Sequence, residues 1–173
     1  MRAQTLLLAL IAGGAIPAAA AQQAQTPLPS AIPQSFTECA AEFRRTSGND
    51  GSPPPPPFEC TRVYFGDLHP GSTYELAAAG GRAVAVGDRY IDDVLRPAIA
   101  TRLAQRSSGA GGKRRLNAFI RLARTAGTAR CALVQEIWSG GTLRVAFASS
   151  CAVQNRDALI EDLLRIEEDL LPR

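Results

Sequence analysis

The sequence of 173 residues has one histidine, one tryptophan and no closely spaced cysteines. The histidine, His69, stands near Asp67 in the segment GDLHPGST, and two such side chains are too few for a usual metal site. The four cysteines show neither the C-x₂₋₄-C spacing of zinc sites nor the C-x-x-C motif of redox proteins. The segment SSGAGGKRR lacks the spacing of a P-loop, and no serine lies in a nucleophile elbow. We therefore expect no enzyme activity, no metal and no cofactor.

Long apolar runs are also absent after the start of the chain. Residues 1–21 join a charged start, the apolar run TLLLALIAGGAI and the small residues PAAAA, which predicts a secretory signal peptide cleaved near Ala21. A retained N-terminal anchor is the alternative interpretation. No later segment approaches the roughly 20 apolar residues of a membrane helix, so we expect no membrane span and a periplasmic or secreted protein. Residues 22–35 are polar with three prolines and are expected to be a disordered tether.

Positive charge is concentrated in the middle of the chain. Residues 82–130 hold 11 basic and 3 acidic residues, a net charge of +8, whereas residues 22–81 and 131–173 each have a net charge of −3. No aromatic residues are interleaved in the manner of nucleic-acid binders, and we expect no nucleic-acid partner. The candidate partner-binding residues share a helix flank and are Arg114, Arg121 and Arg124. They form either a solvated surface with intramolecular ion pairs or a surface for anionic groups.

Apolar residues at three- and four-residue spacing predict three long helices in residues 82–173. The first begins near Arg82, is kinked by Pro97 and ends at the segment SSGAGG. The second spans about residues 113–138, and its predicted core face comprises Leu116, Phe119, Ile120, Ala123, Gly127, Cys131, Val134 and Trp138. The third spans about residues 143–170, with a predicted core face of Phe147, Cys151, Leu159, Leu163, Ile166 and Leu170. These helices predict an all-α fold, an antiparallel three-helix bundle.

The segment before this helical core has a weaker pattern. Residues 36–46 can form a short helix, and the following SGNDGSPPPPP predicts an extended spacer. The tetrapeptide RVYF is compatible with a short strand, and DLHPGST with a turn. We therefore expect one domain over residues 36–173, in which residues 36–81 form an irregular, disulfide-closed N-terminal segment and residues 82–173 the helical core.

An even number of cysteines in an exported chain predicts two disulfides, for which three pairings exist. In an antiparallel hairpin that turns between Gly140 and Gly141, facing residues have numbers that sum to about 281. Cys131 and Cys151 sum to 282, and both lie on predicted core faces. We expect a Cys131–Cys151 disulfide, which leaves Cys39 to pair with Cys60.

The stretch RLNAFIRLARTAGTARC, the Gly-Gly-Thr turn, a second cysteine and NRDALIEDLL resemble the N-terminal domain of LprI-type lysozyme inhibitors. The resemblance covers roughly residues 82–165, and the matching positions include Cys131, Gly140, Gly141, Cys151, Arg156 and Leu159. Arg124 or Thr128 lies near the usual arginine of the family. Phe119 or Ile120 stands where tryptophan is common, and the usual Tyr-Arg-Asp run is absent.

The resemblance implies a protein that binds and inhibits a lysozyme or another cell-wall hydrolase. The residues themselves also fit a different hypothesis, a non-catalytic envelope binding or scaffold module. Its arginine-rich helix would bind an anionic glycan, lipid or protein partner.

Overall fold

The computed structural model describes residues 29–46, 57–68, 71–106, 109–138, 141 and 143–171. These residues are mostly helical, and no strand occurs among them. The all-α expectation is therefore confirmed. The predicted signal peptide, the first part of the tether and most of the proline-rich spacer lie outside the described residues.

The first long helix begins earlier than its apolar pattern predicts. Helix α4 spans Thr73–Tyr90, and the hydroxyl oxygen of its N-cap residue, Ser72, accepts a hydrogen bond from the Glu75 N–H at 3.2 Å. The Glu75 carboxylate accepts another from the Gly71 N–H at 2.9 Å. Two free N–H groups at the helix start are thus satisfied by a serine and a glutamate three residues apart. This capping signal was present in the sequence, within the stretch expected to be a turn.

Proline changes the course of this helix, as predicted, without ending it. Helix α4 continues through a π-helical turn, η1 (Ile91–Leu95), into α5 (Arg96–Gln105), and Pro97 lies in the first turn of α5. Proline has no N–H and clashes with the preceding turn of an α-helix. The wider turn accommodates it: the Arg96 N–H donates to the carbonyl of Ile91, five residues back.

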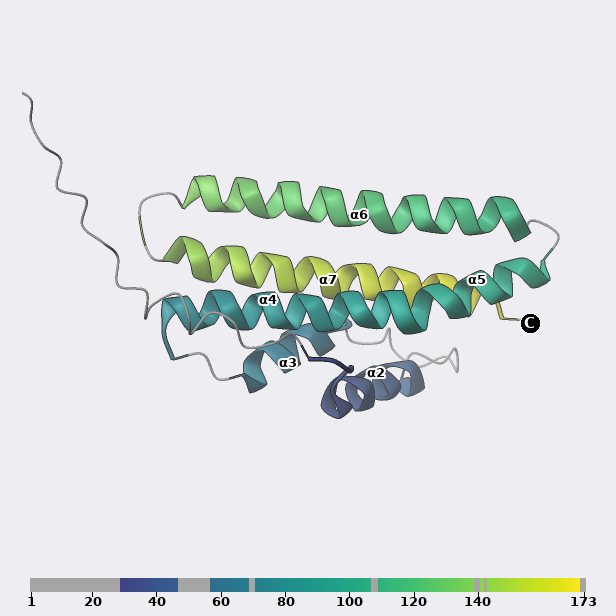
Figure 1. Ribbon diagram of the computed structural model, residues 1–173, viewed down its shortest axis with the longest axis horizontal. Coiled ribbons are helices and arrows are strands. Elements are labelled where there is room, and N and C mark those ends of the chain that lie inside the picture. Colours follow the sequence, from purple (N-terminus) through teal and green to yellow (C-terminus); the bar gives the residue numbers. More distant parts are fainter. Residues whose placement is uncertain are drawn as a thin grey trace, which may run out of the picture.

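Two further long helices, α6 (Gly109–Ile137) and α7 (Leu143–Asp169), lie side by side and run in opposite directions (Figure 1). Helix α4 packs along α7 in the same direction, because Gly80 lies against Ser149 and Gly87 against Arg156. A Cβ atom on Gly80 would come within 2.8 Å of the Ser149 Cβ, so this close approach requires glycine. Helix α5 packs against the first half of α6, and the longest helices thus share one core.

The N-terminal segment is more regular than the sequence indicated. It contains α2 (Gln34–Thr46) and α3 (Cys60–Asp67), so the expected strand at RVYF and the irregular segment were both wrong for the described residues. The start of α3 is capped by α7: the Thr61 and Arg62 N–H groups donate to Asp157 at 2.7 and 3.0 Å. A partner 96 residues away leaves no local sequence signal.

The core lies between this N-terminal segment and the α5 ends of the long helices. Edge-to-face aromatic contacts join Phe36 to Phe58 and Tyr90. The aliphatic part of the same cluster includes Ile91, Leu95, Ile99, Leu116, Ile120, Ile160 and Leu163, all buried. Close to it, the buried Glu167 carboxylate pairs with Arg44 at 2.8 Å and Arg102 at 3.2 Å. Apolar burial is therefore greatest at the end of the molecule farthest from the α6–α7 turn.

Candidate functional site

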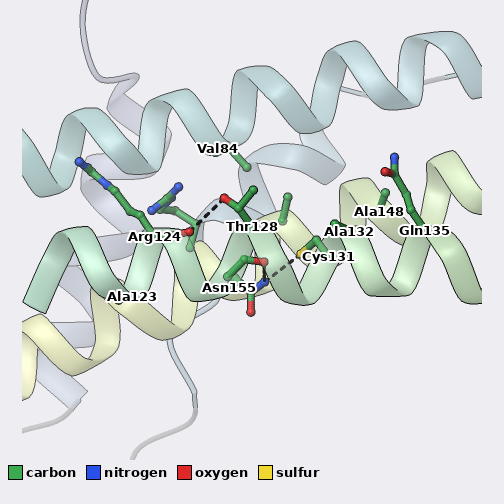
Figure 2. Close-up of a pocket in the computed structure, with 12 residues that line it drawn as sticks. Val84, Ala123, Arg124, Thr128, Cys131, Ala132, Gln135, Ala148 and Asn155 are labelled. Carbon is green, nitrogen blue, oxygen red and sulfur yellow. Dashed lines mark hydrogen bonds between the residues drawn. The ribbon is translucent and has the colours of Figure 1, made fainter.

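A cleft of about 320 Å³ lies between α4 and α6, with residues of α7 on its floor (Figure 2). Its lining is rich in small and aliphatic side chains, namely Val84, Ala123, Gly127, Ala132, Ala148 and Ala152. Small residues at facing positions of α6 and α7 leave space that larger side chains would fill. Arg124, one of the three predicted partner-binding arginines, lines this cleft.

Two arginines that line this cleft, Arg124 and Arg156, form ion pairs with aspartates of α4 and η1. The Arg124 Nη2 atom lies 2.7 Å from Asp88 Oδ1 and 3.2 Å from Asp92 Oδ2, and Arg156 Nη2 lies 3.0 Å from Asp88 Oδ2. Asp92 also pairs with Arg96, whose Nη2 atom lies 3.8 Å from Asp92 Oδ1, so both aspartates have arginine partners. Burial raises the pKa of Asp88 despite the two neighbouring guanidinium groups, and burial lowers the pKa of Arg156.

The floor of the cleft is fixed by a disulfide and an amide. Cys131 and Cys151 are bonded with their Cα atoms 5.6 Å apart, and Cys39 is bonded to Cys60. These are the pairs that the sequence predicts. The Asn155 Nδ2 atom donates to the Gly127 carbonyl at 3.1 Å and lies 2.9 Å from the Cys131 sulfur (Figure 2). Asn155 therefore bridges α7 to α6 at the disulfide.

The reactive groups at the cleft are paired with one another. Its sulfurs are joined in a disulfide, and its carboxylates are held by arginines. Within the described ranges, no group of three or more His, Cys, Asp or Glu side chains could hold a metal ion. The disulfide, the Asn155 hydrogen bond and the ion pairs connect α4, α6 and α7 around the cleft.

The structure separates the three predicted partner-binding arginines. Arg124 faces inward and pairs with the two aspartates, as the ion-pair alternative predicted. Arg114 and Arg121 are exposed on α6, together with Lys113 and Arg115. In the part of the chain that the structure describes, none of these four side chains has an ion pair or hydrogen bond. Among the described residues, nothing competes with an anionic group for these side chains.

An apolar stripe that the sequence interpretation missed runs along the same exposed side of α6. It consists of Phe119, Leu122, Leu133 and Ile137, which are 37, 65, 58 and 68% exposed. These positions recur at helical spacing on a second face, about a quarter turn or more from the core face. We call the stripe and the free basic residues Lys113, Arg114, Arg115 and Arg121 the outer face of α6.

The core faces predicted for α6 and α7 were partly wrong. Phe119 on α6, Trp138 directly after α6 and Phe147 on α7 were expected in the core, yet each is more than one third exposed. Trp138 instead stacks on Phe147, with ring centroids 4.4 Å apart. Leu143 beside them is 61% exposed. The end of the hairpin therefore presents apolar surface to its surroundings.

The outer face of α6 is the stronger candidate for a binding surface, because it has unpaired charge and exposed apolar area together. No helix among the described residues is long and apolar enough to cross a membrane. Comparisons with protein-family models, curated proteins and solved structures find no match to the chain.

Proposed function

We propose that this protein is a non-catalytic binding module that holds an anionic partner against the outer face of α6. The observation that carries the proposal is the contrast within one helix: Arg124 is neutralised by Asp88 and Asp92, whereas Arg114 and Arg121 are exposed and unpaired among the described residues. Arginine forks bind carboxylate and phosphate groups in two-pronged fashion. Arginine and aromatic residues are also enriched in protein-binding surfaces.

The proposal also includes the cellular compartment and the arrangement of the helices. The protein acts in the periplasm or after secretion, following cleavage near Ala21, and its two disulfides are consistent with an oxidising compartment. The helices α4–α5, α6 and α7 form the antiparallel three-helix bundle predicted from the sequence, with α6 at one edge. The opposite directions of α6 and α7 support this arrangement.

Ion-exchange chromatography tests the proposed surface. The mature chain should bind a sulfated resin and elute at a defined salt concentration, because exposed charge pairs are screened by salt. The double variant Arg114→Gln, Arg121→Gln should elute at clearly lower salt, with unchanged thermal stability. Identical elution of the variant and the native protein would contradict the proposal.

A cell-wall hydrolase such as a lysozyme is the second candidate partner, implied by the resemblance to LprI-type inhibitors. The exposed acidic side chains of Asp162, Glu168 and Asp169 near the end of α7 favour it, since they are complementary to a basic enzyme. We expect the mature protein to slow lysis of cell-wall substrate by the enzyme. Undiminished lysis at micromolar excess would exclude this candidate.

A further inference from the structure

We infer that the anionic partner of the outer face of α6 is a lipid surface, on which the helix lies without crossing it. The inference rests on the proposed function and names the partner of the same surface. It follows from three properties of the helix: its exposed apolar stripe, the distribution of its arginines and its position at the edge of the molecule.

The apolar stripe is long and exposed. From Phe119 to Ile137 it extends over roughly 27 Å of helix axis at 1.5 Å per residue. Leu122, Leu133 and Ile137 are each more than half exposed. Side chains of this kind insert into the boundary between lipid headgroups and acyl chains when a helix lies in the membrane plane.

Basic residues lie on both sides of the stripe. Arg121 and Arg130 are on opposite flanks, and Arg115 lies near its N-terminal end, all three of them exposed. Arg130 also donates through Nη1 to Asn155 Oδ1 at 3.3 Å. Long arginine side chains keep their charged ends in the headgroup layer while their stems cover apolar surface. Anionic headgroups attract such residues, and the attraction weakens with salt. The combination provides the two signals, apolar and electrostatic, that stable attachment needs.

The same charge argues against a second copy of the chain as the occupant. Helix α6 carries six basic residues and one acidic residue. Without Arg124, which pairs with Asp88 and Asp92, its net charge is +4. Two such helices in contact along their stripes would repel each other, whichever way they were aligned. An anionic surface reverses the sign of this interaction.

The position of α6 fits a flat partner. The helix is straight and runs along one edge of the molecule, so that a plane can touch it over its whole length (Figure 1). Trp138 and Leu143, 47 and 61% exposed, lie where this edge meets the hairpin turn. Tryptophan is favoured at the level of lipid headgroups, where its amphipathic ring bridges water and hydrocarbon.

Vesicle binding by the full mature chain tests the inference. We expect co-sedimentation with vesicles of mixed phosphatidylglycerol and phosphatidylcholine, little with phosphatidylcholine alone, and release by salt. Trp138 is the only tryptophan, so a blue shift of its emission reports the hairpin end at the same time. An absence of binding to anionic vesicles would overturn the inference.

Matched variants separate the lipid inference from the proposed function. The double variant Leu122→Gln, Leu133→Gln keeps every charge, and we expect roughly tenfold weaker vesicle binding with unchanged elution from sulfated resin. The control Leu171→Gln makes the same change at an exposed leucine outside α6 and should leave vesicle binding unaltered.

The outcomes differ in what they overturn. If the native protein binds resin but not anionic vesicles, the lipid inference fails, the proposed function stands and an acidic protein becomes the partner to seek. If it binds neither, both fail. If the double leucine variant binds vesicles as the native protein does, insertion of the stripe is contradicted.

Discussion

Helix α6 has two faces with the same kinds of residue and different roles. On its inner face Arg124 pairs with two aspartates and Ile120 is buried in the core. On its outer face Arg121 is exposed and unpaired among the described residues, and Leu122 is 65% exposed. Residue type alone therefore does not determine whether a side chain of α6 is paired and buried or exposed. Groups on the neighbouring helices determine this.

The largest difference in stability between the inner and outer faces of α6 is expected for substitutions of apolar residues. Ile120→Ala should lower the free energy of unfolding by about 3 kcal/mol, because it leaves a cavity in the packed core. Leu122→Ala, two positions away, should change it by less than about 0.5 kcal/mol. Urea denaturation of the two variants measures both. Equal losses would show that the outer face is covered by something other than solvent.

The disulfide at the hairpin end should matter almost as much. Replacing Cys131 and Cys151 by alanine should cost about 3 kcal/mol, since the closed loop has a sequence separation of 20 residues. The Cys39–Cys60 loop, with a separation of 21, serves as the matched comparison and should give a similar value. Thermal unfolding under non-reducing conditions measures both losses. An unchanged melting temperature for the first variant would show that packing alone holds α6 to α7 there.

The charge cluster predicts a smaller loss. Arg124→Gln should destabilise the protein by about 1–2 kcal/mol, because Asp88 and Asp92 lose a neutralising partner in a half-buried site. Arg121→Gln should stay within about 0.5 kcal/mol of the native protein. Denaturant unfolding at neutral pH distinguishes them. A larger loss for Arg121→Gln would reverse the assignment of the two faces.

The smallest expected effect is a dependence of protein stability on pH, which binding to the resin should not share. Burial raises the pKa of Asp157, the cap of α3, from 3.8 to about 6. Because the folded-state pKa is the higher one, this group stabilises the fold fully below about pH 4 and loses that contribution as pH rises through 6. Stability should therefore fall by about 1 kcal/mol between pH 5 and 7.

The variant Asp157→Asn is the control for this effect and should flatten that part of the pH profile. Binding to sulfated resin should instead be nearly constant between pH 5 and 7, because arginine stays charged throughout. A binding profile that follows the titration near pH 6 would show that the inner residues take part in binding.

Much of the helical core could be predicted from the sequence. The α6–α7 hairpin, its disulfide and the perturbation near Pro97 follow from local spacing, which is a property of neighbouring residues. The start of α3 could not be predicted, because its cap comes from Asp157 on α7. Phe119 was assigned to the core because it adjoins the predicted core face of α6, and only the position of the neighbouring helices shows that it faces outward.

The sequence predicted the three arginines of the candidate site, but it did not predict which of them face inward and which are exposed. Arg114, Arg121 and Arg124 share a flank by helical spacing, yet Arg124 lies opposite Asp88 on a helix that is distant in sequence. A one-dimensional pattern cannot say which arginine meets a carboxylate. Arg114 and Arg121 can be assigned to the outer face only because the structure shows that Arg124 pairs with Asp88 and Asp92 on the inner face.

The elution of two single variants from sulfated resin tests the division of α6 most directly. Arg121→Gln and Arg124→Gln remove the same charge from positions three residues apart. We predict that Arg121→Gln elutes at lower salt than the native protein, whereas Arg124→Gln, folded at the temperature of the experiment, elutes close to it. Equal shifts for the two variants, or the larger shift for Arg124→Gln, would contradict the proposal that the outer face binds.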